Sequence, residues 1–269
     1  MNDRFRACRF AFWLVVFAAT ISGGVARGDE RHLSFTNDVM PVLTKAGCNI
    51  GVCHAKAGGG QNGFQLSVLG FEPKDDYERF VKEGRGRRLS LASPDQSLVL
   101  RKASGQLPHG GGVRLPVDSP GYALLRQWVQ QGAPFGPADE PKLVGFEVRP
   151  GRGFVKPKGT QQLQAIARYS DGSERDVTAT ALYESNDTAM AEVNPAGVVT
   201  VLDLSGKFSV MVRYQGRVSV FNASVPQGSP VGELPPSRNF IDDLVFANLK
   251  DLGIPPSPVC DDATFLRLS

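Results

Sequence analysis

The chain has 269 residues, enough for one large domain or two smaller domains with separate hydrophobic cores. Hydrophobic residues make up 41% of it and charged residues 21%, which excludes a disordered or fibrous protein. Of its 30 basic and 27 acidic residues, four basic residues and one acidic residue lie within positions 1–28, so the remainder is neutral by count. That balance gives no indication of nucleic acid as a partner.

Residues 1–28 are predicted to be a signal peptide. Three arginines precede a short apolar run at 10–21, and small residues follow before Asp29. The run is too short for a comfortable transmembrane span, so no span is expected after cleavage; an uncleaved membrane anchor is the alternative. The protein is therefore expected to be exported, to the periplasm or the cell surface.

Residues 31–136 are predicted to be α-helical at both ends, with an irregular, glycine-rich middle. Asn37 or Asp38 can cap the first helix, whose apolar residues recur at helical spacing. Ser119 is a suitable N-cap for the last helix, which should end near Gly132.

Residues 143–226 change to a period of two, which is typical of β-strands. The alternating segments lie at 163–169 and 208–214, and the expected turns are Asp171-Gly172 and Gln215-Gly216. Val218 and Val220 continue the alternation after the second turn. Short alternating strands joined by such turns predict an immunoglobulin-like (Ig-like) β-sandwich.

A Pro/Gly/Ser-rich linker at 227–235 precedes a helical segment at 236–269. Asn239 should begin a helix with a broad apolar face, and Gly253 should end it. We expect this segment to be the start of a truncated domain. Cys260 within it would pair with a later cysteine or remain a thiol.

The segment GCNIGVCH at 47–54 has three interpretations. Cys48 and Cys53 could form a small disulfide loop, although that gives His54 no role. A structural zinc site needs about four ligands and would require distant residues to complete it. Covalent haem would use both thiols for thioether bonds and His54 as the proximal iron ligand. Four residues separate the cysteines, so for both thiols to reach one haem these four residues must bulge outward. Residues such as Gly51 permit this conformation.

Two longer stretches carry a resemblance to a known family. The first begins GCNIGVCHAKAGGGQNGFQLSVLGFEPKDDY and continues with the shorter segments GRR, PHGGG and LLRQWVQQGAP. The second, near the end of the chain, is NFIDDLVFANLKDLGIPPSPVCDDATFLRLS. The chain resembles large exported planctomycete proteins in which a cytochrome-c-like domain is followed by a bacterial group 2 Ig-like domain and a domain of unknown function. The resemblance implies one covalent haem c, held by Cys48, Cys53 and His54.

Three further residues are candidates for the same site. No methionine lies between Met40 and Met190, so His109, in the glycine-rich LPHGGG, is the candidate distal iron ligand. The alternative is a loop histidine with the sixth position open or held by water. Arg87 and Arg88 could pair with haem propionates, or they form a solvated basic loop.

These observations lead to three hypotheses about function. The first is an exported c-type cytochrome module that transfers single electrons to an unknown redox partner, fused to an Ig-like spacer. The second is a non-redox scaffold, associated with the cell surface or polysaccharide, whose cysteines form a disulfide loop. A haem enzyme with an open distal side is a third alternative. No catalytic residues are assigned, and any catalytic domain is expected beyond residue 269.

Overall fold

The computed structural model describes residues 31–258 and 260–268, so the predicted signal peptide at 1–28 lies outside the described part. The chain divides into two units, Met1–Arg31 and His32–Ser269, and all the elements named here belong to the second. Its α-helices are α1 (Met40–Lys45), α2 (Pro73–Tyr77), α3 (Leu98–Ala103), α4 (Pro120–Gln130), α5 (Phe240–Leu252) and α6 (Asp262–Leu268). Short π-helical segments lie at Phe35–Val39 and Glu78–Lys82, and 3-10 turns at Lys56–Gly58, Val68–Gly70, Glu83–Gly86 and Pro94–Gln96.

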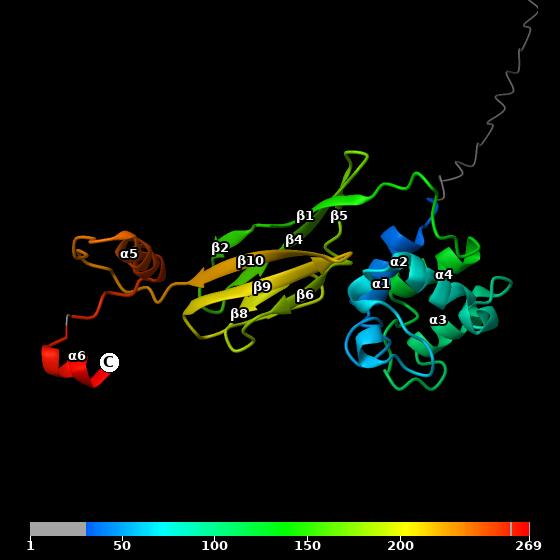
Figure 1. Cartoon of the computed structure of the whole chain (residues 1–269), viewed down its shortest axis with the longest axis horizontal. Helices are drawn as coiled ribbons and strands as arrows, with labels where there is room; N and C mark the ends of the chain where they lie inside the picture. The colour runs from blue at the N-terminus through cyan, green and yellow to red at the C-terminus, as the bar shows by residue number, and fades with distance from the viewer. Residues whose placement is uncertain (1–30, 259, 269) are drawn as a thin grey trace, which may run out of the picture. The chain divides into compact units, whose positions relative to one another are not determined.

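The prediction of an α-helical cytochrome-c-like domain at 31–136 is wrong. Among the described residues of this region, α4 has 11 residues, whereas every other helix has six or fewer. Long loops connect these short helices (Figure 1). Glycines interrupt the helical pattern, because several of them, such as Gly59 and Gly60, adopt positive φ values that an α-helix excludes. The most extensive regular structure in the described chain is a β-sandwich.

The start of the region also differs from prediction. Ser34 is the N-cap: its Oγ accepts a hydrogen bond from the N–H of Asn37 at 3.0 Å. The carboxylate of Asp38 in turn accepts from the N–H of Ser34 at 2.8 Å. These reciprocal bonds resemble a capping box and fix where the chain enters the helix. At the other end of the region, the predicted cap is confirmed, since Ser119 Oγ accepts from the N–H of Tyr122.

Large buried side chains hold these short helices together. The ring of Trp128, fully buried on α4, lies 5.8 Å from that of Phe35 and 6.0 Å from that of Phe80, measured between centroids. The indole N–H of Trp128 donates to the carbonyl of Pro134 at 2.8 Å, so its one polar group is satisfied. Leu43 of α1 belongs to the same cluster, which anchors the helix that leads into GCNIGVCH.

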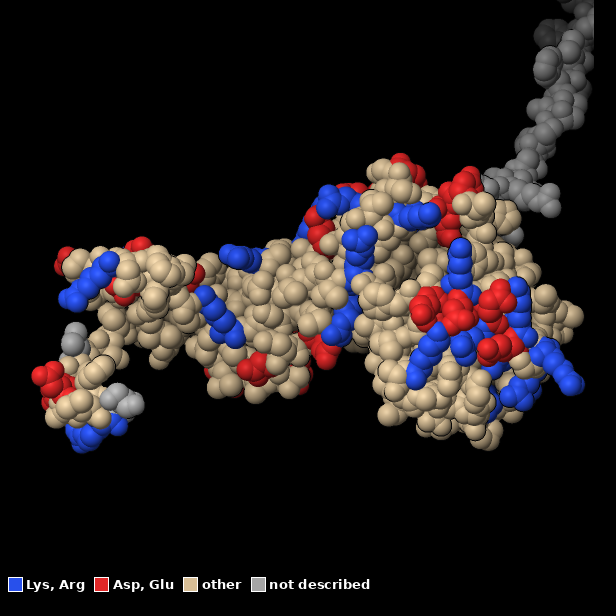
Figure 2. Space-filling model, viewed as in Figure 1, with Lys and Arg blue, Asp and Glu red and all other residues tan. Residues whose placement is uncertain are grey.

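The surface over α2 and the π-helical segment after it carries many charged side chains. Acidic and basic groups lie side by side there (Figure 2). The ion pairs are Lys56–Glu72, Lys56–Asp75, Arg79–Asp75, Arg79–Glu83 and Lys82–Glu78. Because these pairs lie at the surface, where water and salt screen them, they contribute little to stability. They cover the surface and do not define a site.

In the described part of the chain, ten strands form three small sheets. They are β1 (Leu143–Arg149), β2 (Arg152–Phe154), β3 (Thr160–Gln162), β4 (Gln164–Tyr169), β5 (Glu174–Asp176), β6 (Leu182–Ser185), β7 (Ala191–Val193), β8 (Val198–Val201), β9 (Gly206–Tyr214) and β10 (Arg217–Val225). The strand orders are β1-β4-β5, β2-β10-β9-β6 and β3-β8-β7 (Figure 1). All pairs are antiparallel except β2 with β10.

The predicted alternation is confirmed along β4 and β9. Side chains at every second position are buried: Leu163, Ala165, Ala167 and Tyr169 on one, and Phe208, Val210, Val212 and Tyr214 on the other. Both predicted turns are present. In the second, Gln215 and Gly216 have φ values of 45° and 72°, as a two-residue turn between twisted strands requires.

The predicted alternation is present in β10, but the buried side chains are at odd-numbered positions. Val218 and Val220 are exposed, whereas Phe221 and Ala223 are buried. The two-residue turn pairs Tyr214 with Arg217, and this register places the odd-numbered positions of β10 from 217 to 223 opposite buried positions of β9. Because opposed side chains share a face, the even-numbered positions face outward.

The C-terminal segment begins as predicted. The side chain of Asn239 accepts hydrogen bonds from the N–H groups of Ile241 and Asp242, and Gly253 ends α5 with a φ of 62°. Phe240 and Leu244 on this helix are 72% and 67% exposed, whereas Leu252 at its end is buried, so the described residues leave the first half of its apolar face exposed. In the described part of the chain, no helix is long and apolar enough to cross a membrane.

Candidate functional site

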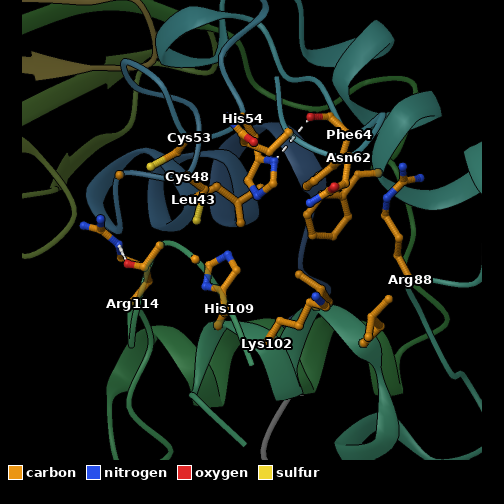
Figure 3. Close-up of a pocket in the computed structure, with 18 of the residues that line it drawn as sticks. Leu43, Cys48, Cys53, His54, Asn62, Phe64, Arg88, Lys102, His109 and Arg114 are labelled. Atoms are coloured by element: carbon orange, nitrogen blue, oxygen red, sulfur yellow. Dashed lines mark hydrogen bonds between the residues drawn. The ribbon is translucent and has the colours of Figure 1, made fainter. Parts of the chain in front are cut away.

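The structure brings all the predicted site residues to one cavity. It has a volume of about 450 Å³ and lies between the GCNIGVCH segment, the loop before α3 and the glycine-rich loop after it (Figure 3). Its lining includes Cys48, Cys53, His54, Arg87, Arg88 and His109. These residues are up to 61 positions apart in sequence, so the fold itself creates their proximity.

The segment between the cysteines forms the predicted bulge. Gly47 ends the preceding helix with a φ of 77°, and Gly51 has a φ of 55°. The N–H of His54 donates to the carbonyl of Cys48 at 3.0 Å, which closes the loop at its base. Asn49 is fully buried and donates through Nδ2 to Thr44 Oγ1, which ties the loop to α1. The four extra residues thus form a defined loop that keeps both cysteines at the cavity.

His54 and His109 face each other across the cavity (Figure 3). Their ring centroids are 6.2 Å apart and their planes are inclined by 11°. His54 Nδ1 lies 3.2 Å from the carbonyl oxygen of Phe64, and His109 Nδ1 lies 2.9 Å from that of Gly112. With a proton on Nδ1, each ring donates to its carbonyl and leaves Nε2 as a free acceptor or ligand.

The electrostatic environment favours neutral side chains at this site. Burial lowers the pKa of His54, and nearby positive groups, including Arg88 and Lys102, lower it further. The hydrogen bond to Phe64 acts in the opposite direction. Burial also raises the pKa of Cys48 to about 12, assisted by the proximity of Cys53. At neutral pH, His54 is therefore an imidazole and Cys48 a thiol.

The two arginines are not equivalent. Arg88 is buried, and its Nη1 donates to the carbonyls of Arg79 at 2.7 Å and Glu83 at 2.8 Å. Its guanidinium also lies over the ring of Phe64, 4.5 Å from the centroid. Arg88 therefore holds the loop that carries it in place. Arg87 is exposed at the cavity edge and is free to meet an anionic group of a bound molecule.

Three lining residues were missed by the sequence analysis. Phe64 is half-buried and packs on His54 with ring centroids 4.7 Å apart. Lys102 comes from α3, and Arg114 follows the glycine-rich loop, donating through Nε to the carbonyl of Gly111 at 2.7 Å. Lys102 and Arg114 lie on either side of LPHGGG in the sequence. This position next to the candidate ligand His109 could have indicated that they line the same cavity.

Two of the predicted site types find no support. The structure contains Cys48, Cys53 and Cys260 as free cysteines, so the small disulfide loop is not formed. Among the described residues, no group of three or more His, Cys, Asp and Glu side chains could hold a metal ion. This removes the zinc interpretation. Together with the fold, it also corrects the classification as a metal-binding cytochrome c for electron transfer.

Comparison with known proteins assigns no family. No protein-family model matches the chain, and no curated protein matches it. The solved structures that are similar include the S-layer protein rSbsC(31-844), at 18% identity and a TM-score of 0.29, with 35% of this chain and 14% of that one covered. An intimin mutant of EHEC O157:H7 covers 43% of this chain and 68% of its own, at 16% identity and a TM-score of 0.22.

A third similar structure is the adhesin InvE of Yersinia pseudotuberculosis, at 16% identity and a TM-score of 0.22, with 39% of this chain and 32% of that one covered. The chain thus spans only a small part of the S-layer protein, and TM-scores this low assign it no function. What its own structure defines is a β-sandwich protein with a cysteine- and histidine-lined cavity outside the sandwich.

Proposed function

We propose that the protein is an exported scaffold of the cell surface, with the β-sandwich as its structural module. The observation that carries this proposal is the sandwich core. It is continuous from β1 to β10, and all 19 of its buried members are apolar or tyrosine. The hydroxyls of Tyr169 and Tyr214 bond each other at 3.0 Å, so the polar ends of these rings are satisfied. Sandwiches of this kind recur as rigid modules in cell-surface proteins.

Localisation tests the scaffold directly. The full chain would be expressed with its own N-terminal segment in a Gram-negative host, followed by cell fractionation and protease treatment of intact cells. We expect the protein in the cell envelope, shortened by about the length of a signal peptide and cleaved by the external protease. A Leu14→Arg variant, which interrupts the apolar run, should remain inside the cell at full mass. Wild-type protein that behaves like this variant would contradict the proposal.

A second candidate concerns the cavity, and the observation that favours it is the pairing of His54 with His109. A bare ion needs a cluster of protein ligands, whereas haem brings four nitrogens of its own and requires only axial groups. The two parallel imidazoles, with Nε2 free on each, fit that requirement. The cavity also places both cysteine thiols and the cation of Arg87 on its lining.

In this second candidate, Cys48 and Cys53 would hold one haem c, and His54 and His109 would bind its iron. Bound haem would supply an iron whose reactivity these two histidines adjust. The protein positions the imidazoles through the carbonyls of Phe64 and Gly112 and supplies the apolar ring of Phe64.

Maturation of the chain with a c-haem maturation system tests this candidate. We expect a covalent adduct by intact mass and a pyridine haemochrome spectrum, both lost in Cys48→Ala/Cys53→Ala. The variants His109→Met and His109→Ala should retain the adduct but change its spin state. A colourless product of apoprotein mass would exclude haem and leave the scaffold proposal unaffected. Unchanged spectra in both His109 variants would exclude the distal role.

A further inference from the structure

A groove of about 660 Å³ lies on the outer face of the sheet that contains β2, β10 and β9. Figure 1 shows these three strands next to one another. Arg152 of β2 pairs with Asn222 of β10, which pairs with Ser209 of β9. Side chains that oppose each other on neighbouring strands share a face, so the three form a row across the sheet.

Hydrogen bonds fix the amide groups of this row. Ser209 Oγ donates to Asn222 Oδ1 at 2.8 Å, and the N–H of Ser209 donates to Asn186 Oδ1 at 2.6 Å. Both amide oxygens are therefore occupied by donors from the sheet. Within the described residues, the Nδ2 groups of Asn186 and Asn222 have no acceptor, so each presents two free donors to the groove.

A second row runs parallel to the first. Phe154 of β2 pairs with Ser224 of β10, which pairs with Lys207 of β9. Gly153, between the two rows, faces the core, because a Cβ there would lie 3.3 Å from the ring of Phe221. Phe154 must therefore point outward, and it is 65% exposed. An aromatic ring that is this exposed on a strand offers a flat apolar surface to a ligand.

The groove has an excess of cations and donors. Neither Arg152 nor Lys207 forms an ion pair with any residue that the structure describes. Asp251 of α5 supplies the one carboxylate among the described lining residues. Two unpaired cations and two amide donors together favour a ligand that is rich in oxygen acceptors and carries negative charge.

We infer that this groove binds an acidic polysaccharide, a polymer of uronic acid units. Its carboxylates would accept hydrogen bonds from Arg152 and Lys207, its hydroxyl oxygens would accept from the two amides, and the apolar face of a sugar ring would lie on Phe154. The outward positions of the sheet repeat at about 4.8 Å across strands and about 6.6 Å along them, so the contacts cover more than one sugar. The inference rests on the proposed surface location, where such polymers occur.

Calorimetric titration of the full chain tests the groove, with sodium polygalacturonate as the ligand and uncharged dextran as the comparison. We expect polygalacturonate to bind and dextran not to bind. In Arg152→Gln/Lys207→Gln, the affinity should fall by about tenfold or more, because two charge-assisted hydrogen bonds are lost. Phe154→Ala should also weaken binding. The control Lys158→Gln/Arg168→Gln removes the same charge from exposed sandwich positions outside the groove and should bind normally.

Three outcomes would overturn the inference: no binding of polygalacturonate by the wild-type chain, equal losses in the groove and control variants, or equally tight binding of single-stranded DNA. The replaced residues are exposed, so these substitutions leave the core intact. The titration is independent of the localisation experiment. If the protein is at the surface but does not bind polygalacturonate, the binding proposal for the groove fails and the scaffold proposal stands. If the protein binds polygalacturonate but stays in the cytoplasm, the scaffold proposal fails.

Discussion

His54 is half-buried beside positive groups, and this environment penalises its charged form. The hydrogen bond to the carbonyl of Phe64 offsets only part of the penalty, so the pKa of His54 in the folded chain lies below its ordinary value of 6.5. The unfolded chain regains the ordinary value. Between these two pKa values, the unfolded state binds more protons than the folded state, and acid therefore favours unfolding.

We accordingly expect the free energy of unfolding to fall as the pH is lowered from about 7.5 to 5.5, with part of that fall due to His54. His54→Gln should lose less stability over the same range, because glutamine does not titrate. Urea denaturation at several pH values would measure both. Parallel curves for wild type and His54→Gln would contradict the expectation.

At the scale of single residues, sequence reasoning located the cavity but not its full lining. The sequence spacing alone identifies Cys48, Cys53 and His54 as one candidate site, because they lie within seven positions of one another. His109 was a candidate from its residue type and glycine-rich surroundings alone, and the fold places its ring 6.2 Å from that of His54. Arg88 could not be interpreted from sequence, because its partners are backbone carbonyls that only the folded loop brings near.

Among the helices, α4 contributes most to the N-terminal core. Leu125, Trp128 and Val129 have no exposed surface. Its start depends on Ser119, whose Oγ accepts a hydrogen bond from the N–H of Tyr122 and also donates to the carbonyl of Pro116 at 2.6 Å. A side chain that caps the helix thus also fixes the preceding turn.

Replacement of Ser119 by alanine should lower the free energy of unfolding by about 1 kcal/mol, the usual effect of losing an N-cap. Ser119→Asp should retain most of the stability, because its carboxylate can accept the same hydrogen bond and interacts favourably with the helix N-terminus. Urea denaturation followed by tryptophan fluorescence would report both changes. Equal losses in the two variants would show that the contact with Pro116 matters more than the cap.

Elements with strong local signals were predictable, and elements that depend on tertiary context were not. The turn at Gln215-Gly216 and the cap at Ser119 are encoded within a few residues. The inward face of β10 depends instead on how the turn sets its register against β9, and the apolar Val218 and Val220 lie on the exposed face. Apolar spacing before Gly47 predicted one helix, yet the chain forms a π-helical turn followed by a short α-helix.

Over the whole molecule, two hydrophobic clusters form without sharing a residue. One contains Trp128 and the helices around it, and the other is the sandwich core with Leu163 and Phe208. Trp128 is the one tryptophan between residues 29 and 269, so its fluorescence reports on the first cluster alone.

We expect the two clusters to unfold as separate transitions. Leu163→Ala should destabilise the sandwich by about 2–5 kcal/mol, as for other fully buried leucines, and leave the fluorescence midpoint unchanged. Leu125→Ala should shift the fluorescence midpoint and leave hydrogen exchange in β9 unchanged. Shifts of both signals in both variants would mean that the chain unfolds as one cooperative unit.

The raised pKa of Cys48 makes this thiol less reactive in the folded chain than in the unfolded chain. A thiol with a pKa of about 12 is almost wholly protonated in neutral solution, and the thiolate is its reactive form. In the unfolded chain this sulfur is hydrated, so more of it is thiolate at neutral pH than in the folded protein. Covalent attachment at Cys48 is therefore expected to be faster before the chain folds than after it.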